Sequence, residues 1–221
     1  MTSKKIYIVR HGETEYNKLG LVQGCGIDAG LNDLGRKQAR AFHQHFKDFP
    51  FDKIYTSKLK RTHQSVWSFI EDGISWQQLE GLNEISWGVK EGRIITEEDD
   101  RQYYTMIEGW KKGQLHLKVE KGESPLEVQT RQQIAWKYIM SNPYEQNVLI
   151  CMHGRAIRIL LSWLIGHDLS QMDQFEHQNL CLYLLHYEKG NYSIEKRNDV
   201  THLQHLNNLA DTVSDSFISG N

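Results

Sequence analysis

The sequence predicts an α/β protein: a three-layer sandwich with a mostly parallel central sheet, helices on both faces and one insertion. Short apolar runs at residues 6–9 and 148–152 have the length and composition of buried parallel strands. Segments whose apolar residues recur at helical spacing lie between such runs. Local helix-start signals, such as the sequence Ser-Pro-Leu-Glu at 124–127, mark where several of these helices begin.

The first half of the chain alternates strands and helices. The glycine-rich segment 11–31 is predicted to be a loop that closes over a ligand. Asn32 is a good N-cap for an amphipathic helix that runs to about residue 47. The other predicted elements are a strand at 6–10, a strand at 53–56, a helix at about 59–72 that Gly73 ends, and a strand at 75–79.

The second half begins with a predicted loop at 84–95, which contains Gly88 and Gly92. Thr96 starts a polar helix with a capping-box pattern. The acid-rich start of this helix suggests an insertion over the sheet edge and not a core element. The other predicted elements are a helix at 124–141, a strand at 148–152, an apolar helix at 155–164, and an antiparallel edge hairpin at 180–187 and 192–196.

The length of 221 residues fits one α/β domain with a sizeable core. We predict a single domain over residues 1–206, with an insertion at about 93–122 as its cap, followed by a polar tail at 207–221. The formal net charge of −2 and the scattered lysines and arginines give no nucleic-acid footprint. An anion site in this chain must therefore be local.

The three cysteines, Cys25, Cys151 and Cys181, are an odd number. Cys151 and Cys181 lie in apolar strand-like runs, so we expect core positions and not a disulfide. No long apolar run follows the N-terminus. We therefore expect no secretory signal, no transmembrane helix and no membrane partner, and a cytoplasmic location is the default expectation.

Two predicted strands end in the same unusual way. Residues 6–9 are followed by Arg10-His11-Gly12, and residues 148–152 are followed by His153-Gly154. In open α/β sheets, ligands bind beyond the carboxyl ends of the strands. The pattern therefore predicts two imidazoles that face one ligand.

These residues belong to a longer ordered set, by which the chain resembles the histidine phosphatase superfamily, also called phosphoglycerate mutase-like. The resemblance covers roughly residues 5–190, and its motifs come in the family's order. Arg-His-Gly alone would be a weak signal, whereas the ordered set is specific. The set comprises Arg10-His11-Gly12-Glu13-Thr14, Asn17, Gln23-Gly24, Ser57-Lys58-Leu59-Lys60-Arg61-Thr62, Leu82-Asn83-Glu84, Gly88, Glu91-Gly92, Gly122-Glu123-Ser124 and His153-Gly154.

The resemblance implies phosphoryl transfer through histidine. His11 would be the nucleophile, because a neutral imidazole nitrogen can attack phosphorus and form a phosphohistidine. His153 would stabilise the charge that develops during transfer. Arg10 and Arg61 would bind the phosphate dianion, which arginine can do bidentately and at any relevant pH.

The remaining site residues also follow from the resemblance. Glu84 would be the general acid that protonates the leaving oxygen, since a nearby phosphate dianion favours a protonated carboxyl group. Asn17 and Gln23 would be neutral donors to the phosphate, with Gly24 and Gly154 beside it. We expect no metal and no cofactor, because the arginines supply the positive charge. The partner would be a small phosphorylated metabolite, and a homodimer is left open.

Three functions are compatible with this site. They are a phosphomonoesterase for a small metabolite, a cofactor-dependent phosphoglycerate mutase that uses the same phosphohistidine, and an inactive phosphate-binding module. Mutases of the family carry arginines and a proline-rich stretch in the insertion, and usually a basic tail. Here the only prolines are Pro50, Pro125 and Pro143, and no lysine or arginine follows Arg197. We therefore favour the phosphatase.

A few positions depart from the family pattern or lie outside it. Lys90 stands where many members have a tryptophan, and Arg155 stands where a small residue is more usual, so its role stays open. Glu13 is expected to be structural. His43 and His45 point to different faces of a predicted helix, so we expect surface residues and not metal ligands.

Overall fold

The computed structural model describes residues 3–206, and the predicted tail at 207–221 lies outside the described residues. Its centre is one six-stranded sheet in the order β3-β2-β4-β1-β5-β6. The first four of these strands are mutually parallel, β5 is antiparallel to β1, and β6 is antiparallel to β5. The strands are β1 (Lys4–Arg10), β2 (Lys53–Thr56), β3 (Trp76–Gln78), β4 (Asn147–Met152), β5 (Leu182–Glu188) and β6 (Asn191–Asp199).

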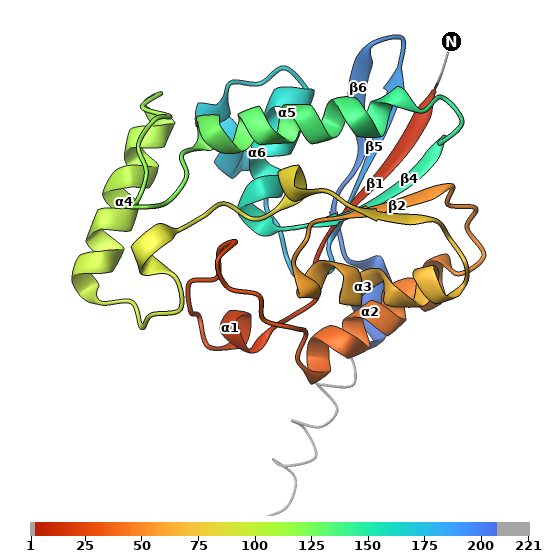
Figure 1. Ribbon diagram of the computed structural model, residues 1–221, viewed down its shortest axis with the longest axis horizontal. Helices are drawn as coiled ribbons and strands as arrows, with labels where there is room; N and C mark the ends of the chain where they lie inside the picture. The colour runs from red at the N-terminus through yellow and green to blue at the C-terminus, as the bar shows by residue number, and fades with distance from the viewer. Residues whose placement is uncertain (1–2, 207–221) are drawn as a thin grey trace, which may run out of the picture.

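Helices cover both faces of this sheet, which confirms the predicted fold class. In Figure 1, α5 (Pro125–Ser141) and α6 (Gly154–Leu164) lie above the sheet, and α2 (Asp33–Phe46) and α3 (Lys60–Glu71) lie below it. Successive side chains of a strand point to opposite faces. Accordingly, Ile6 and Ile8 of β1 join the core under α5 and α6, whereas Tyr7 and Val9 join the core under α2 and α3.

The predicted helix starts are present as specific hydrogen bonds. The Asn32 side chain accepts from Gly35 N at 2.8 Å and caps α2. Helices α4 (Glu97–Lys111) and α5 each begin with a capping box, at Thr96 and Ser124. The side chain of the N-cap residue accepts from the backbone N–H of the third helical residue, and the side chain of that third residue accepts from the backbone N–H of the N-cap.

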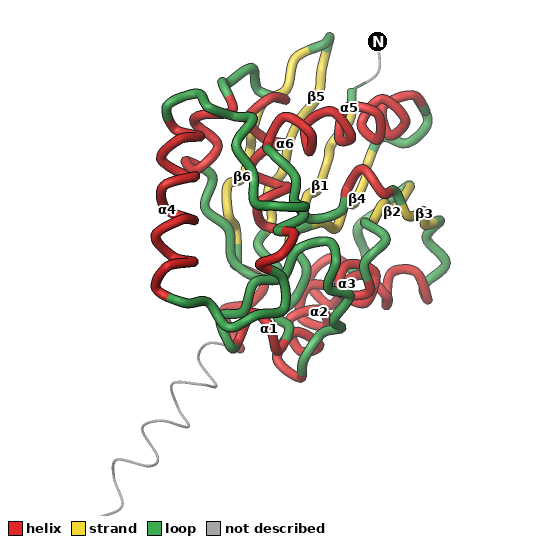
Figure 2. The backbone as a smooth tube through the Cα atoms, turned by 60° about the vertical axis from the view of Figure 1, so that its left-hand side comes forward, coloured by secondary structure: helices red, strands yellow, loops and turns green. Residues whose placement is uncertain are grey.

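Helix α4 belongs to the predicted insertion and stands beside the sheet, not on it. Figures 1 and 2 both place it away from the strands, on the α6 side of the molecule. Its buried face consists of Met106, Ile107 and Trp110, which pack with Ile159 of α6 and with Leu169 in one hydrophobic cluster. That this insertion acts as a cap stays a prediction.

Some local structure differs from the sequence-based expectation. The predicted loop 11–31 contains a short helix, α1 (Glu15–Lys18), which Thr14 caps. A 3₁₀ helix at Leu169–Gln174, which was not predicted, packs against α6. Among residues 3–206 all three cysteines are free, and every helix is too short or too polar to span a bilayer.

Candidate active site

The two histidines come together because their strands are paired. Strands β1 and β4 are parallel neighbours, and Arg10 is in register with Met152. His11 and His153 are the next residues of each strand end, and their ring centroids are 5.1 Å apart. The sequence prediction that both imidazoles lie at one sheet edge is confirmed.

His11 is held in one tautomer. Its Nδ1 lies 2.7 Å from the carbonyl oxygen of Gly12. A carbonyl can only accept, so Nδ1 carries the hydrogen and Nε2 keeps its lone pair. Burial lowers the pKa of His11 well below its ordinary value, and the charges of Arg61 and Arg10 lower it further. The result is a neutral imidazole with a free nucleophilic nitrogen.

His153 has the opposite tautomer. Arg61 Nε donates to its Nδ1 at 3.2 Å, so the hydrogen sits on Nε2, which donates to Ser57 Oγ at 2.8 Å. The pKa of His153 is also lowered well below the ordinary value, first by burial and then by the charge of Arg61. His153 is therefore a neutral hydrogen-bond donor, bound to Ser57 in this structure.

Arg61 is completely buried at the centre of the site. Besides its bond to His153, it donates from Nη1 to Ile27 O at 2.7 Å and from Nη2 to Gly24 O at 3.1 Å. Burial lowers its pKa to about 10, against the opposing charge of Glu84. Of the five N–H donors of a guanidinium, these bonds use three. Arg61 thus holds the 24–27 segment and keeps two donors for a ligand.

Arg10 and Gln23 each have a buried donor atom without a hydrogen-bond partner among residues 3–206. These atoms are Arg10 Nε and Gln23 Nε2. Gln23 Oε1 is occupied, because it accepts from Thr14 Oγ1 at 2.9 Å. Buried donors are nearly always paired in folded proteins. Two unpaired donors in one site therefore indicate that an acceptor, such as an anion, completes it.

The structure places the other predicted phosphate-site residues around this centre. Asn17 Oδ1 accepts from Thr14 N and from Asn179 Nδ2, both at 3.2 Å, so its amide nitrogen is the end left for a ligand. A Cβ on Gly24 would lie 2.1 Å from Glu91 Oε1. A Cβ on Gly154 would lie 2.6 Å from the His177 ring. Both glycines are needed for this close packing.

Glu84 is buried and accepts three backbone hydrogen bonds. Oε1 accepts from Ile85 N and Ala156 N, both at 2.9 Å, and Oε2 accepts from Arg155 N at 3.1 Å. The carboxylate thus caps the N-terminus of α6, directly after His153. Its charge opposes the effect of burial on both Arg10 and Arg61. Glu84 thus lies at the start of α6 next to His153, a capping contact that the sequence did not indicate, and its role as general acid stays a prediction.

Sequence reasoning did not find His177 and Asn179. Arg10 Nη1 lies 3.2 Å from His177 Nδ1, and Asn179 Nδ2 donates to His11 O at 3.1 Å. Burial, followed by the charges of Arg10, Arg158 and Arg155, lowers the pKa of His177 to about 3. Both residues precede β5, which is antiparallel to β1. The start of an antiparallel strand meets the end of its neighbour, so the pairing of β5 with β1, which the sequence did not indicate, brings these residues next to His11.

Two further residues, Arg155 and Glu13, have specific contacts in the structure. The buried Arg155 donates from Nη1 to Asp173 and from Nη2 to Tyr103 Oη at 3.0 Å, and its guanidinium lies over the Trp110 ring. It therefore ties α4 to the start of α6. Glu13 Oε1 accepts from Asn32 Nδ2 at 2.8 Å, in keeping with the structural role expected for it.

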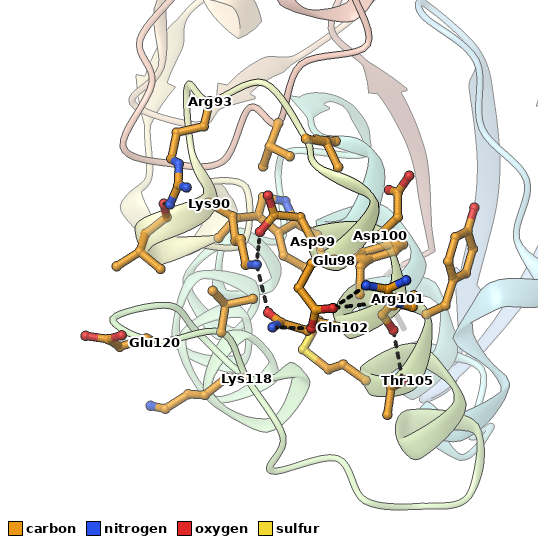
Figure 3. Close-up of a pocket in the computed structure, with 18 of the residues that line it drawn as sticks. Lys90, Arg93, Glu98, Asp99, Asp100, Arg101, Gln102, Thr105, Lys118 and Glu120 are labelled. Carbon is orange, nitrogen blue, oxygen red and sulfur yellow. Dashed lines mark hydrogen bonds and ion pairs between the residues drawn. The ribbon is translucent and has the colours of Figure 1, made fainter.

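A cavity of about 910 Å³ lies beside the site and reaches Gln23. It is lined by α4 and by the segments 87–95 and 114–120, including Trp87 and Tyr103. Figure 3 shows that Lys90 reaches across to Asp99 and Gln102 of α4. The volume of this cavity falls in the usual range of ligand pockets.

Two buried histidines, the buried Arg61 and the half-buried Arg10 thus gather near the carboxyl ends of the parallel strands, where they can bind an anion beside a neutral imidazole. The chain belongs to the histidine phosphatase superfamily (branch 1), whose family model matches residues 6–200. It is an enzyme of the phosphatase and mutase type within that family.

Individual relatives are distant in sequence but match nearly the full length. Phosphoserine phosphatase 1 of Hydrogenobacter thermophilus is 28% identical over 200 residues, covering 90% of this chain and 94% of that protein. A probable phosphoglycerate mutase GpmB of Yersinia pestis is 29% identical over 209 residues, covering 90% and 94%. The solved structure of Bacillus stearothermophilus YhfR has a TM-score of 0.78 and 25% identity, covering 90% and 99%.

Proposed function

We propose that the protein is a phosphomonoesterase that hydrolyses a small phosphorylated metabolite through a phosphohistidine at His11. The observation that carries this proposal is the free Nε2 lone pair of a neutral His11 beside the unpaired donors of Arg10 and Gln23. The charge of Arg10 acts on His11, and Gln23 bonds to Thr14, three residues after His11, so the nucleophile and the free donors belong to one region. This is what attack on a phosphate monoester requires.

The reaction has two chemical steps. His11 Nε2 attacks phosphorus, and the bond from phosphorus to the ester oxygen breaks. Glu84 gives its proton to the departing oxygen, and the alcohol leaves. Water then attacks the phosphohistidine, Glu84 takes up a proton from it, and inorganic phosphate leaves with His11 neutral again.

The other site residues act on charge. Arg10 and Arg61 oppose the charge of the phosphate, and Gln23 and Asn17 add neutral donors. His153 carries its hydrogen on Nε2, and this hydrogen can turn from Ser57 to a phosphoryl oxygen during transfer. The positive charge needed for phosphoryl transfer is then supplied by side chains, so the proposed mechanism uses no metal ion.

A phosphoglycerate mutase is the second candidate, because relatives with that name match the chain over most of its length. The composition of the insertion favours the phosphatase. Helix α4 begins with four acidic residues, Glu97, Glu98, Asp99 and Asp100, and the insertion at about 93–122 contains no proline, unlike the proline-rich stretch of the mutases.

The test is a panel of phosphorylated metabolites scored for released phosphate, with and without EDTA. We expect phosphate release from at least one monoester, unchanged by the chelator and lost in His11→Ala. A parallel assay of phosphoglycerate interconversion, primed with the bisphosphate, detects a mutase. A folded wild-type protein that releases phosphate from no monoester, p-nitrophenyl phosphate included, would contradict the proposal.

A further inference from the structure

The backbone around Glu84 is bonded by a single guanidinium. Arg131 of α5 donates from Nη1 to Gly81 O at 3.0 Å and to Asn83 O at 2.9 Å, and from Nη2 to Glu84 O at 3.0 Å. Three carbonyls within four consecutive residues thus point at the same side chain. In Figure 1 the turn at Glu80–Leu82, which begins this stretch, lies under α5.

Glu123 fixes this guanidinium and also bonds the same backbone segment further along. Its Oε1 accepts from Arg131 Nε at 2.8 Å, and its Oε2 accepts from Arg131 Nη2 at 3.0 Å. A two-point pair of this kind fixes the orientation of both groups. Oε2 also accepts from Ser86 N at 2.9 Å. Arg131 and Glu123 therefore hold residues 81–86 together, and we call the two side chains the Arg131–Glu123 clamp.

Arg131 has no donor left for a ligand. A guanidinium has five N–H groups, and the bonds of Arg131 to three carbonyls and two carboxylate oxygens use all five. Its positive charge is matched by the carboxylate of Glu123. Arg61, by contrast, keeps two donors for a ligand. What Arg131 does in this arrangement is hold a backbone segment in place.

The held segment carries the residue to which the proposed mechanism assigns proton transfer. The Glu84 carboxylate accepts from Ala156 N at 2.9 Å and from Arg155 N at 3.1 Å, so it lies between the clamped segment and the start of α6. A general acid must be within hydrogen-bond reach of the oxygen that it protonates. A misplacement of about 1 Å can cost about 10²-fold in rate. The clamp is therefore in a position to control how well Glu84 is aligned.

We propose that Arg131 and Glu123 are positioning residues, which align the Glu84 carboxyl group for proton donation to the leaving oxygen. This inference rests on the proposed function and on the role of Glu84 in it. The phosphate-binding residues proposed above lie outside the clamp. Loss of the clamp should therefore slow the step that needs the proton and leave phosphate binding unchanged.

The test compares phenyl phosphate with p-nitrophenyl phosphate, which have nearly the same shape. Phenolate is the stronger base, so its departure depends more on a donated proton. In Arg131→Gln we expect the ratio of kcat/KM for phenyl phosphate to kcat/KM for p-nitrophenyl phosphate to fall about ten- to hundred-fold, and by less than in Glu84→Gln. The inhibition constant of inorganic phosphate should stay near its wild-type value.

Three further variants separate alignment from charge and from stability. Arg131→Lys keeps the charge but cannot make the five bonds, so its ratio should fall as well. Ile139→Val removes a buried methyl group from the same helix and should keep the wild-type ratio. Adding Arg131→Gln to Glu84→Gln should lower the ratio no further, because both changes act on one proton transfer.

The ratio is measured within each variant, so a partial loss of folded protein cancels. Equal slowing of the two substrates in Arg131→Gln and Arg131→Lys would show that the clamp only supports the fold, and would overturn the inference while phosphatase activity stands. A wild-type ratio in Glu84→Gln would overturn it too, since Glu84 would then donate no proton. If no monoester is hydrolysed, the proposed function fails and this inference fails with it.

Discussion

The Nε–H of Arg61 donates to Nδ1 of His153 across 3.2 Å. This bond places the imidazole hydrogen on Nε2, the nitrogen that can donate to a transferring oxygen. The carbonyl of Gly12 has the opposite effect on His11 and leaves its Nε2 bare. One histidine is thus prepared as a donor and the other as a nucleophile.

Arg61→Lys should therefore reduce activity strongly, although the lysine keeps the positive charge. A lysine cannot donate to His153 and also reach the Ile27 and Gly24 carbonyls. We expect kcat/KM to fall by about 100-fold or more, since charge-assisted hydrogen bonds contribute about 1.5–3 kcal/mol each. Steady-state kinetics with p-nitrophenyl phosphate measure this. Arg40→Lys is the matched surface control. Near-wild-type activity of Arg61→Lys would show that the hydrogen bonds of the Arg61 guanidinium are not needed.

Glu84→Gln separates general acid catalysis from binding. An amide cannot give up a proton, so alkyl phosphates should be hydrolysed about 10²–10⁴-fold more slowly. p-Nitrophenyl phosphate should be slowed much less, because nitrophenolate leaves without a proton.

The same variant has a structural effect that must be measured alongside. The amide nitrogen of Gln cannot accept the hydrogen bonds that the Glu84 oxygens accept at the start of α6, so the melting temperature should fall. This loss affects both substrates alike and cancels in their ratio. Equal slowing of the two substrates would show that Glu84 only binds or supports, and Glu13 would be tested next.

The fold could be predicted where local signals are strong. Asn32 and the pairs Thr96 with Asp99 and Ser124 with Glu127 show helix starts in the sequence itself. The short helix α1 was missed because four residues are too few for a helical period. Its cap at Thr14 is visible only once Asn17 is seen to bond back.

The site could be predicted where residues follow parallel strands. His11 and His153 each follow a parallel strand, so the sheet rule predicts that both lie at one sheet edge. That the two strands are direct neighbours is visible only in the structure. His177 depends on the antiparallel pairing of β5 with β1, which no periodicity reveals. The contact of Glu84 with α6 arises from tertiary packing and was beyond prediction from sequence. The arginines next to His11 indicated a lowered imidazole pKa, whereas the larger effect of burial became visible only in the fold.

Acid should destabilise the fold partly through His202, which is buried outside the site and bonds to Leu180 O at 2.8 Å. Burial lowers its pKa from 6.5 to about 4. The unfolded chain then binds this proton more readily, so the free energy of unfolding falls as pH drops from about 6.5 to about 4. One such proton contributes about 1.4 kcal/mol per pH unit. Denaturant unfolding at several pH values measures this dependence. The free energy of unfolding of His202→Gln should change less steeply with pH than that of the wild type, and an identical pH dependence would contradict this.

In the proposed mechanism, His11 carries the phosphoryl group. The most direct measurement is rapid acid-free quenching of the enzyme with ³²P-labelled substrate, followed by peptide mapping of the label. We expect an acid-labile, base-stable label on the peptide that contains His11, and no label in His11→Ala. A label on another residue, or normal turnover by His11→Ala, would contradict it.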